Sequence, residues 1–492
     1  MNTLRLILFL FTLALSALGL SACATNPATK SSDFVMMSET QELELGQKAA
    51  AEVAKSLPLM DEHDPLVRYV DSVGQKIANV SDRPNLFYRF HVVDNADINA
   101  FALPGGYIYI NRGLLIHMNS EAELAAVLGH EIGHVTARHA VKQYSKAKAY
   151  QVGAMVASIF LPVPQGAGML SDLVAMAVIR GYGRDAELQA DELSIRYITR
   201  AGYDPNATIG ILKTLKRLED IDTSRKKDAG DKVEKYHGAF STHPDTEKRI
   251  KEAVAKAALS QHATGITNRQ ALLSALDGYP YGDSPAQGAV VGQRFLHPDL
   301  GIQLKFPAEW VITNTPTTLQ ARLRQKDVYF QLQLKELRKR QSASAVLQSI
   351  FPKRHTKMLA GGTQSGMPFA HAEVRMSAPH VSQATIDAYV FLKGSQAFVL
   401  AMWSQRDDFI NRLRDFSSIA RSFGKYDGKG GIPRIALHIW QASDSWEKLA
   451  VRNRHILGRF TAAKLAALNG MDTNERPHPG QIIKTVGIKT VQ

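Results

Sequence analysis

Residues 120–134 read Ser-Glu-Ala-Glu-Leu-Ala-Ala-Val-Leu-Gly-His-Glu-Ile-Gly-His, and this stretch decides the fold of the first half of the chain. Ser120 followed three residues later by Glu123 is a capping box, which predicts a helix running from about residue 121 into the 140s. Residues four apart on a helix differ by only ~40° around its axis, so His130 and His134 present their imidazoles from one face. Two neutral imidazoles on adjacent turns can bind one divalent ion, and zinc suits nitrogen ligands at ~2.0–2.1 Å. Glu131 lies ~100° round the helix, close enough to reach a water on the metal without binding the metal.

A catalytic zinc site needs a third protein ligand beside the water. His139 lies half a turn off the face of the two motif histidines, so we do not expect it to bind the metal. Glu187 is the favoured third ligand, because it lies on a second predicted helix that could cross the first. Asp191, one turn further along the same face, is placed to orient a ligating histidine. From spacing alone, Asp185 and Glu192 stay open as alternatives to Glu187.

Helical spacing with few breakers also predicts helices over residues 38–57, 66–78 and 185–200, while residues 87–93 are typical of a strand. Residues 101–110 predict a strand pair or bent strand around Pro-Gly-Gly. The apolar stretch 149–178 is interrupted by prolines and glycines, which leaves too few continuous apolar residues to span a bilayer. It predicts a helical hairpin packed on the core, with a flap facing the membrane or the substrate as the alternative.

Four motifs in one order resemble the zinc metallopeptidase family that contains HtpX, the CAAX prenyl protease and BepA, a gluzincin-like HExxH family. The motifs are Asn-Ala-Phe-Ala-Leu-Pro-Gly-Gly at 99–106, the His-Glu-Ile-Gly-His motif, Glu-Leu-Gln-Ala-Asp at 187–191 and Ser-Thr-His-Pro at 241–244. The similarity covers roughly residues 35–260. It implies a mainly helical, zincin-type peptidase domain with a small edge sheet.

The resemblance also implies a role for individual residues. One Zn²⁺ per chain is bound by His130, His134 and Glu187, Glu131 is the catalytic base, and Asp191 orients a ligand. His243 is implied to lie near the zinc, where it either stabilises the oxyanion or caps the metal in a latent state. The edge strand that includes Asn99, Ala100 and Phe101 is implied to bind an extended substrate by β-augmentation.

The N-terminus indicates the compartment. Arg5 precedes an apolar run that ends in Leu20-Ser21-Ala22-Cys23, which resembles the bacterial lipobox. We therefore expect a lipoprotein signal peptide over 1–22, lipidation of Cys23, the sole cysteine, and a tether over 23–34. The alternative is a plain signal peptide with an incidental cysteine. Ala24 after the cysteine favours a periplasmic protein anchored to the outer membrane.

Charge is distributed unevenly along the chain. Residues 291–492 contain 29 Lys and Arg against 14 Asp and Glu, whereas the whole chain has a net charge of +13. In a periplasmic compartment this basic half would meet anionic lipid, lipopolysaccharide or peptidoglycan, and we expect no nucleic-acid partner. A solubilising charge excess without a specific partner is the alternative.

The remaining sequence predicts the other domains. The zinc metallopeptidase domain is expected over 35–262, followed by a linker over 263–292 and a basic α+β domain of unknown role over 293–425. Residues 433–488 resemble a small LysM-like βααβ unit. Gln441-Ala442-Ser443 replaces the usual glycine of that unit, which leaves open whether it binds glycan or caps the fold.

These observations predict an α+β protein that is a zinc-dependent endopeptidase of the bacterial envelope. Its expected substrates are misfolded or misassembled envelope proteins, hydrolysed by metal-activated water with Glu131 as general base. One alternative is a chaperone or adaptor at the outer membrane with a latent zinc site. Another is a peptidoglycan-binding tether with an ancillary protease.

Overall fold

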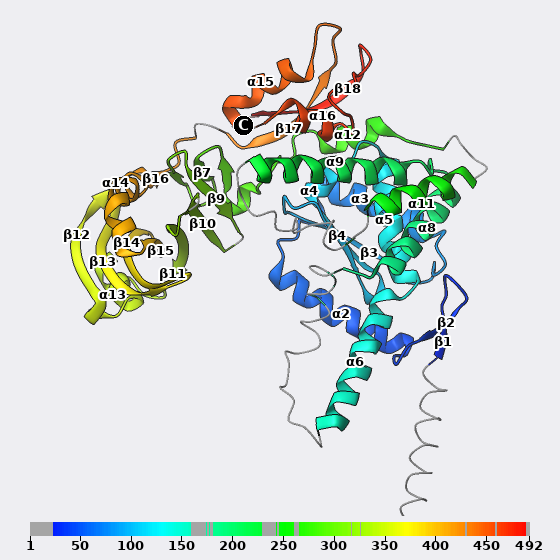
Figure 1. The fold of residues 1–492 in the computed structure, drawn as a ribbon, viewed down its shortest axis with the longest axis horizontal. Helices are drawn as coiled ribbons and strands as arrows, with labels where there is room; N and C mark the ends of the chain where they lie inside the picture. The colour runs from blue at the N-terminus through cyan, green and yellow to red at the C-terminus, as the bar shows by residue number, and fades with distance from the viewer. Residues whose placement is uncertain are drawn as a thin grey trace, which may run out of the picture. The chain divides into compact units, whose positions relative to one another are not determined.

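The structure, a computed structural model, describes residues 23–158, 174, 177, 181–228, 243, 246–259, 265–315, 317–324, 326–428, 431–457 and 460–488. It is a mixed α+β fold, as predicted (Figure 1). The chain divides into two compact units. The first comprises Met1–Asp277, Leu437–Leu449 and Thr461–Thr485, and the second Gly278–Ala436, Ala450–Phe460 and Val486–Gln492. The predicted signal peptide and most of the apolar stretch 149–178 lie outside the described residues.

The first unit is mainly helical around one small sheet. Its described helices are α2 (Glu39–Ser56), α3 (Pro65–Ala78), α4 (Arg112–Leu115), α5 (Glu121–Thr136), α6 (His139–Ser158), α8 (Arg184–Arg200), α9 (Ala207–Asp228), α11 (Thr246–Leu259), α12 (Arg269–Leu276) and α16 (Ala462–Leu468). The sheet has the order β3-β5-β4, with β3 (Arg89–Val93) parallel and β4 (Ala100–Leu103) antiparallel to β5 (Tyr107–Asn111). β4 is therefore an edge strand of this sheet, where the sequence predicted one.

The helix that carries the His-Glu-Ile-Gly-His motif starts as predicted and ends earlier. The Ser120 side chain accepts a hydrogen bond from the Glu123 backbone N–H at 3.2 Å and so caps the first turn of α5. The helix was expected to run into the 140s, but it ends at Thr136. Arg138 adopts the left-handed conformation with φ of 55°, which an α-helix cannot contain, and a new helix, α6, begins at His139. The chain therefore changes direction between His134 and His139.

Residues 23–34, expected as a free tether, contain an antiparallel hairpin of β1 (Cys23–Thr25) and β2 (Ser32–Phe34). Asn26 in its turn is buried and donates from Nδ2 to the carbonyl oxygen of Ala137 at 3.0 Å, just beyond the end of α5. Lys142 of α6 pairs with Asp33 at 3.1 Å. This hairpin is thus attached to the helices of the first unit.

The expected linker over 263–292 also has secondary structure. It contains α12, whose Leu272, Leu273 and Leu276 are fully buried, the 3₁₀ turn η3 (Pro285–Gln287) and strand β6 (Ala289–Val291). Its mixture of glycine, proline and small residues suggested a linker because such composition disfavours regular structure. The three leucines at helical spacing gave a signal for α12 that this composition obscured.

The second unit contains a seven-stranded antiparallel sheet of order β12-β13-β14-β15-β11-β10-β9. Its strands are β9 (Trp310–Asn314), β10 (Thr318–Leu323), β11 (Tyr329–Glu336), β12 (Thr356–Gln364), β13 (Met367–Ala378), β14 (Val381–Lys393) and β15 (Gln396–Ser404). A smaller sheet has the order β16-β8-β7-β6, with β7 (Arg294–His297), β8 (Ile302–Lys305) and β16 (Gly424–Lys425).

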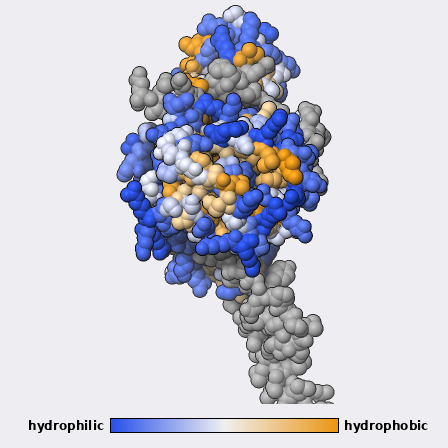
Figure 2. Space-filling model, turned by 90° about the vertical axis from the view of Figure 1, so that its left-hand side faces the viewer, coloured by the Kyte–Doolittle hydropathy of each residue, from blue (hydrophilic) through white to orange (hydrophobic). Residues whose placement is uncertain are grey.

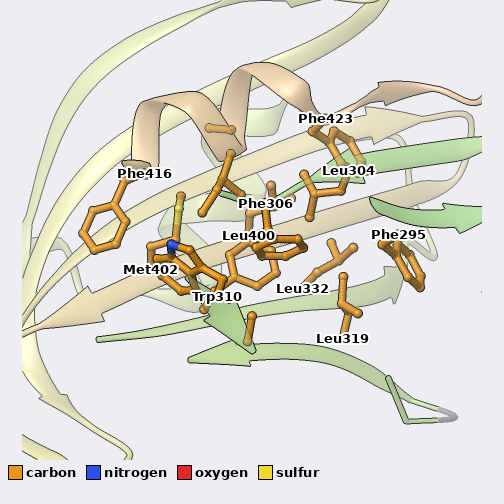
Figure 3. Close-up of a cluster of buried hydrophobic side chains, with 14 of the residues drawn as sticks. Phe295, Leu304, Phe306, Trp310, Leu319, Leu332, Leu400, Met402, Phe416 and Phe423 are labelled. Carbon is orange, nitrogen blue, oxygen red and sulfur yellow. The ribbon is translucent and has the colours of Figure 1, made fainter. Parts of the chain in front are cut away.

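Two helices cover the large sheet from opposite faces. α14 (Arg406–Ser422) packs Phe416 into a core with Leu400 and Met402 from one face (Figure 3). α13 (Ala343–Ile350) packs on the other face, over β13, β14 and the start of β15, where it contacts Ala397. Figure 2 shows the molecule from the side on which β12 lies in Figure 1. The surface that faces the viewer has hydrophobic and weakly polar residues ringed by hydrophilic ones.

The last segment follows the order β17 (Pro433–Ile439), α15 (Trp446–Leu457), α16 and β18 (Ile482–Ile488), with β17 and β18 paired in a two-stranded sheet. This is the βααβ order expected from the sequence. None of the described helices is long and apolar enough to cross a bilayer.

Candidate metal centre

Two glycines allow the motif helix α5 and helix α8 to pack closely. A Cβ built at Gly133 would lie 3.1 Å from the Ala190 carbonyl oxygen, and one at Gly129 would lie 3.1 Å from Ser194 Oγ. Side chains at these positions would therefore force the helices apart. Because both glycines are on the face of α5 that meets α8, the close packing brings Glu187 of α8 beside the motif histidines.

Four side chains from three segments converge at this contact: His130, His134, Glu187 and His243. The Nε2 atoms of His130 and His134 are 2.9 Å apart, and they lie 3.4 and 3.5 Å from the two carboxylate oxygens of Glu187. His243 Nδ1 lies 3.3 Å from His130 Nε2 and 2.8 Å from Glu187 Oε2. Each of the four residues offers one ligand atom, and these four atoms all lie within 4.8 Å of one another.

These distances fit a zinc ion. Four donors ~2.0–2.1 Å from one tetrahedral ion lie ~3.3 Å from one another. The spacings between the donor atoms scatter about that value. Among the described side chains, Glu187 Oε1 is buried without a hydrogen-bond partner, which is costly for a carboxylate oxygen unless a cation neutralises it. The donor set of imidazole nitrogens and one carboxylate is a set that zinc prefers.

Each motif histidine is held by a partner at its other ring nitrogen. His130 Nδ1 lies 2.8 Å from Asp191 Oδ1, and Arg249 of α11 holds that carboxylate with two hydrogen bonds of 2.7 and 2.8 Å. His134 Nδ1 lies 2.8 Å from His139 Nδ1, whose Nε2 lies 2.8 Å from Gln189 Oε1. Partners of this kind fix the tautomer that leaves Nε2 facing the metal.

Burial and charge shift the pKa values of these groups in opposite directions. Burial lowers the pKa of His130, but the hydrogen bond and charge of Asp191 outweigh burial and raise it to about 9. Burial and the neighbouring His130 lower the pKa of His134 well below its usual value, and burial lowers that of His139 to about 4. Burial raises the pKa of Glu187, but His243 and His130 hold it well below the ordinary range. His130 is therefore charged at neutral pH, beside the carboxylates of Glu187 and Asp191.

Glu131 lies beside the four donors without joining them. Its side chain is fully buried, Oε2 has no hydrogen-bond partner among the described residues, and Oε1 is 3.8 Å from His243 Nε2. Burial raises its pKa above the ordinary glutamate value. A cavity of about 50 Å³ opens next to it, lined mainly by apolar residues including Ile211, Leu212 and Leu215. A carboxylate with a raised pKa and a free oxygen is suited to accept and return a proton.

The edge strand β4 runs past the same site. His243 Nε2 lies 3.3 Å from the Ala100 carbonyl oxygen, and Tyr182 Oη donates to the Ala102 carbonyl oxygen at 3.4 Å. The Asn111 backbone N–H donates to the Asn99 carbonyl oxygen, so the carbonyls of residues 100 and 102 point away from β5. These are the acceptors that an added strand would use. In this structure side chains of the chain itself contact them.

The structure brings together most of the residues predicted for the site. His130, Glu131, His134, Glu187, Asp191 and His243 lie in one buried cluster, and Asn99, Ala100 and Phe101 are buried beside it, the last two on β4. The two alternatives for the third ligand are elsewhere: Asp185 is exposed, and exposed Glu192 pairs with Lys256 at 2.9 Å. Cys23 begins β1. Ser241, Thr242 and Pro244 of the fourth motif lie outside the described residues.

Three residues of the site were not predicted. Arg249 lies six residues after His243, and nothing in its sequence context distinguishes it from other arginines. Tyr182 stacks on His134 with ring centroids 4.2 Å apart and follows a segment without clear periodicity. His139 is not among the clustered donors, as predicted, but the break before α6 brings it against His134, which a continuous helix would not do. The residue at position 138 that interrupts the helix is an arginine, which gave no sign of a break.

Comparison with known proteins gives an independent result. Residues 66–257 match peptidase family M48. The chain is 28% identical over 222 residues to a beta-barrel assembly-enhancing protease of Escherichia coli, covering 43% of each chain. It is 31% identical over 195 residues to the mitochondrial metalloendopeptidase OMA1 of Schizosaccharomyces pombe, covering 39% of this chain and 54% of that one.

The chain thus spans about half or less of the length of these curated relatives. A likeness to the solution structure of PsbP from Synechocystis, at 14% identity, covers 30% of this chain and 98% of that one with a TM-score of 0.24. That score is too low to indicate a shared fold.

Proposed function

We propose, from the match of residues 66–257 to peptidase family M48, that the chain is a zinc metalloendopeptidase. The observation that carries the proposal is the buried cluster of His130, His134, Glu187 and His243, in which Glu187 Oε1 has no hydrogen-bond partner among the described residues. Glu131 lies beside this cluster, where it can act as a general base. A hydrolase needs such a base, whereas a purely structural zinc site does not.

In this proposal each residue of the cluster has one role. His130, His134 and Glu187 hold one Zn²⁺. Asp191, itself held by Arg249, orients His130, and His139 orients His134. When bound, zinc supplies Lewis-acid activation of water and of the scissile carbonyl. Glu131 takes the proton from the attacking water and returns it to the leaving nitrogen.

We assign His243 the role of a cap on the metal. Its Nδ1 stands among the donor atoms, 3.3 Å from His130 Nε2, and its Nε2 faces the open edge of β4. The site in this conformation is therefore latent, because the same side chain takes the fourth donor position and an acceptor of the substrate-binding edge. The second role considered, stabilisation of the oxyanion, requires His243 to leave the metal while remaining at the edge strand.

The substrate in this proposal is a protein chain in extended conformation, bound as an added strand along β4 at Asn99, Ala100 and Phe101. One similar protein is named a beta-barrel assembly-enhancing protease. Together with the lipobox-like Leu20-Ser21-Ala22-Cys23, this supports a lipid-anchored enzyme in the periplasm, at the outer membrane, that removes misfolded or misassembled envelope proteins. Contacts of the basic second half with peptidoglycan, lipopolysaccharide or anionic lipid form part of the same proposal.

The test is cleavage of an unfolded protein by the purified chain. Reduced casein should be cut by the zinc-loaded protein, and the cleavage should stop with a chelator and return when zinc is added. Cleavage that persists after complete metal removal would refute the proposal. The alternative function is that of a chaperone or adaptor without proteolytic activity. In that case the zinc-loaded protein should suppress aggregation of an unfolded protein without cutting it, even after substitution of His243.

A further inference from the structure

Strand β12 forms one edge of the large sheet in the second unit. β13 pairs with one side of β12, and none of the described strands pairs with its other side (Figure 1). Every residue from 357 to 363 is exposed. Every second residue of an edge strand directs its backbone N–H and C=O away from the neighbouring strand. β12 therefore presents a row of backbone donors and acceptors to which another strand can pair.

The protection that exposed edges usually carry is weak at β12. Proteins shield such edges with prolines, bulges, charged side chains or short strands. β12 has nine residues and no proline. Its bulge lies between Met358 and Ala360, and residues 360–364 after it stay in continuous register with β13. These five residues are therefore long and regular enough to accept an added strand.

The side chains along this edge are apolar or small. Met358 is 39% exposed and Leu359 is 47% exposed. Gly362 lies opposite Phe369 of β13, and a Cβ built at Gly362 would lie 3.3 Å from the Phe369 ring. Because glycine leaves that place open, an added strand can put an apolar side chain beside the partly buried ring. Glycine in an edge also specifies register weakly, so partners of different sequence can pair with it.

The charge around this edge is positive. Residues 337–372, which lead into and through β12, contain six Lys and Arg and no Asp or Glu. They include exposed Lys353, shortly before the strand, and exposed Lys357 on it. Glu373 of β13 lies opposite Lys357, but Arg375 already pairs with Glu373 at 2.8 Å. Charge complementarity therefore favours a partner with acidic side chains over a second copy of this edge, which would bring none.

We propose that β12 binds an extended, acidic segment of another protein chain as an added strand. Residues 360–364 supply the backbone hydrogen bonds. Leu359 and Phe369 contact apolar side chains of the bound segment, and Lys353 and Lys357 face its carboxylates. None of these residues belongs to the metal centre, so the inference goes beyond the proposed peptidase function and does not depend on it.

The experiment measures binding of fluorescent nonapeptides to the full-length chain by fluorescence anisotropy. The first peptide alternates valine with glutamate, and the second alternates valine with lysine. The third is the glutamate peptide with N-methyl groups on alternate backbone nitrogens, which removes the donors along one of its edges. The zinc-loaded Glu131→Gln chain prevents cleavage of the peptides. The metal-free chain should bind them in the same way, so a failed peptidase proposal leaves this result unchanged.

The three peptides separate the backbone contribution from the charge contribution. We expect saturable binding of the glutamate peptide and at least about 3-fold weaker binding of the lysine peptide, because several exposed ion pairs are replaced by repulsion. The N-methylated peptide should not bind, since it cannot complete the hydrogen bonds of an added strand. Absence of saturable binding, or equal binding of the glutamate peptide and its N-methylated form, would overturn the proposal.

Charge reversals place the binding on β12. Lys357→Glu should weaken binding of the glutamate peptide by about 3-fold or more, whereas Lys305→Glu, the same change at an exposed lysine of β8, should not. Lys353→Glu repeats the test outside the strand ladder, where the new carboxylate does not lie opposite Glu373. Equal effects of Lys357→Glu and Lys305→Glu would overturn the proposal. So would a dimer in analytical ultracentrifugation that Leu359→Ser converts to monomer, because a second copy would then occupy the edge.

Discussion

His243 Nδ1 lies 2.8 Å from Glu187 Oε2, so a histidine from the segment before α11 contacts the proposed metal-binding carboxylate of α8. Its other ring nitrogen faces the Ala100 carbonyl oxygen of the edge strand at 3.3 Å. One side chain therefore links the metal centre to the strand that would bind substrate. A substrate strand has to displace it.

This contact predicts that His243→Ala activates the enzyme. The substitution frees the fourth donor position and the Ala100 acceptor, so an extended substrate no longer competes with an internal group. We expect casein cleavage to increase by about 3–10-fold, the gain expected when a closed state that holds most of the population is removed. Initial rates at equal zinc occupancy measure the effect. A fall to the background rate would instead assign His243 to oxyanion stabilisation.

Glu131→Gln should retain the metal and lose turnover. The amide has nearly the same shape but cannot accept the proton from water, and loss of a general base costs about 10²–10⁴-fold in rate. Glu131 is not among the four clustered donors, so zinc content should equal that of the unsubstituted chain. Metal analysis and casein cleavage on the same preparation test both parts. Wild-type turnover by zinc-loaded Glu131→Gln would remove Glu131 from the mechanism.

The pKa of His130 predicts that zinc binding releases a proton. In the metal-free site this pKa is raised to about 9, so the imidazole is charged at pH 7 and must lose its proton before Nε2 can bind zinc. Apparent zinc affinity should therefore increase from pH 7 up to about pH 9 and then level off. The stability of the metal-free fold should change with pH in the opposite direction. The charged His130 contributes fully to this stability below pH 6.5, and the contribution is lost as pH rises through about 9.

Asp191→Asn separates this effect from burial. The neutral amide no longer favours the charged imidazole, so the pKa of His130 should fall and fewer protons should be released at pH 7. Titration calorimetry in two buffers of different ionisation enthalpy counts those protons. Zinc affinity should also drop by about 10–100-fold, as for other partners that orient a metal ligand. Unchanged proton release would show that Asp191 does not set the charge of His130.

The sequence predicted the helical half of this site well, and the reason is periodicity. His130 and His134 are four residues apart on one capped helix, so local geometry alone places their side chains together. The sequence favours Glu187 over Asp185 and Glu192 as the third ligand but does not exclude these two, because the choice depends on how α8 is rotated against α5. That rotation is set by tertiary packing at glycines whose partners are distant in sequence.

The parts that could not be predicted depend on backbone conformation or on long-range contacts. His139 reaches His134 because Arg138 adopts a left-handed conformation, which arginine rarely does and which no residue nearby signals. Asn26 attaches the N-terminal hairpin through a hydrogen bond to Ala137, and a polar, proline-containing segment gives no sign of such a contact. The α+β class of the second unit was predicted from strand alternation, whereas the strand order is set by pairing between distant segments.

The close packing of α5 on α8 predicts that Gly133→Ala weakens the metal centre. The added methyl group would meet the Ala190 backbone, which cannot rotate away, so α8 must shift and carry Glu187 with it. We expect zinc affinity to fall by about 10-fold or more, since a shift of a few tenths of an ångström disturbs tetrahedral donor distances. Gly183→Ala is the matched control, because none of the described atoms lies within 4 Å of its added Cβ and its φ is −73°. Equal zinc affinities of the two variants would contradict the packing argument.

The C-terminal strand supplies a buried lysine to the start of the motif helix, and this predicts a structural role for residues beyond the peptidase domain. Lys484 of β18 is fully buried and donates from Nζ to the carbonyl oxygens of Ile116, at 2.8 Å, and Met118. Burial lowers the pKa of its ammonium well below the ordinary value. Lys484→Met keeps the length of the side chain but leaves both carbonyls without this donor. We expect the free energy of unfolding to fall by about 1–3 kcal/mol.

Chemical denaturation of Lys484→Met against Lys448→Met measures this loss. Lys448 is exposed on α15, so its replacement should change the free energy of unfolding by less than about 0.5 kcal/mol. Because Met118 directly precedes the segment that caps α5, the Lys484 variant should also lower zinc affinity, while the Lys448 variant should not. Equal stability of the two variants would mean that β18 is attached to this unit by its apolar residues alone.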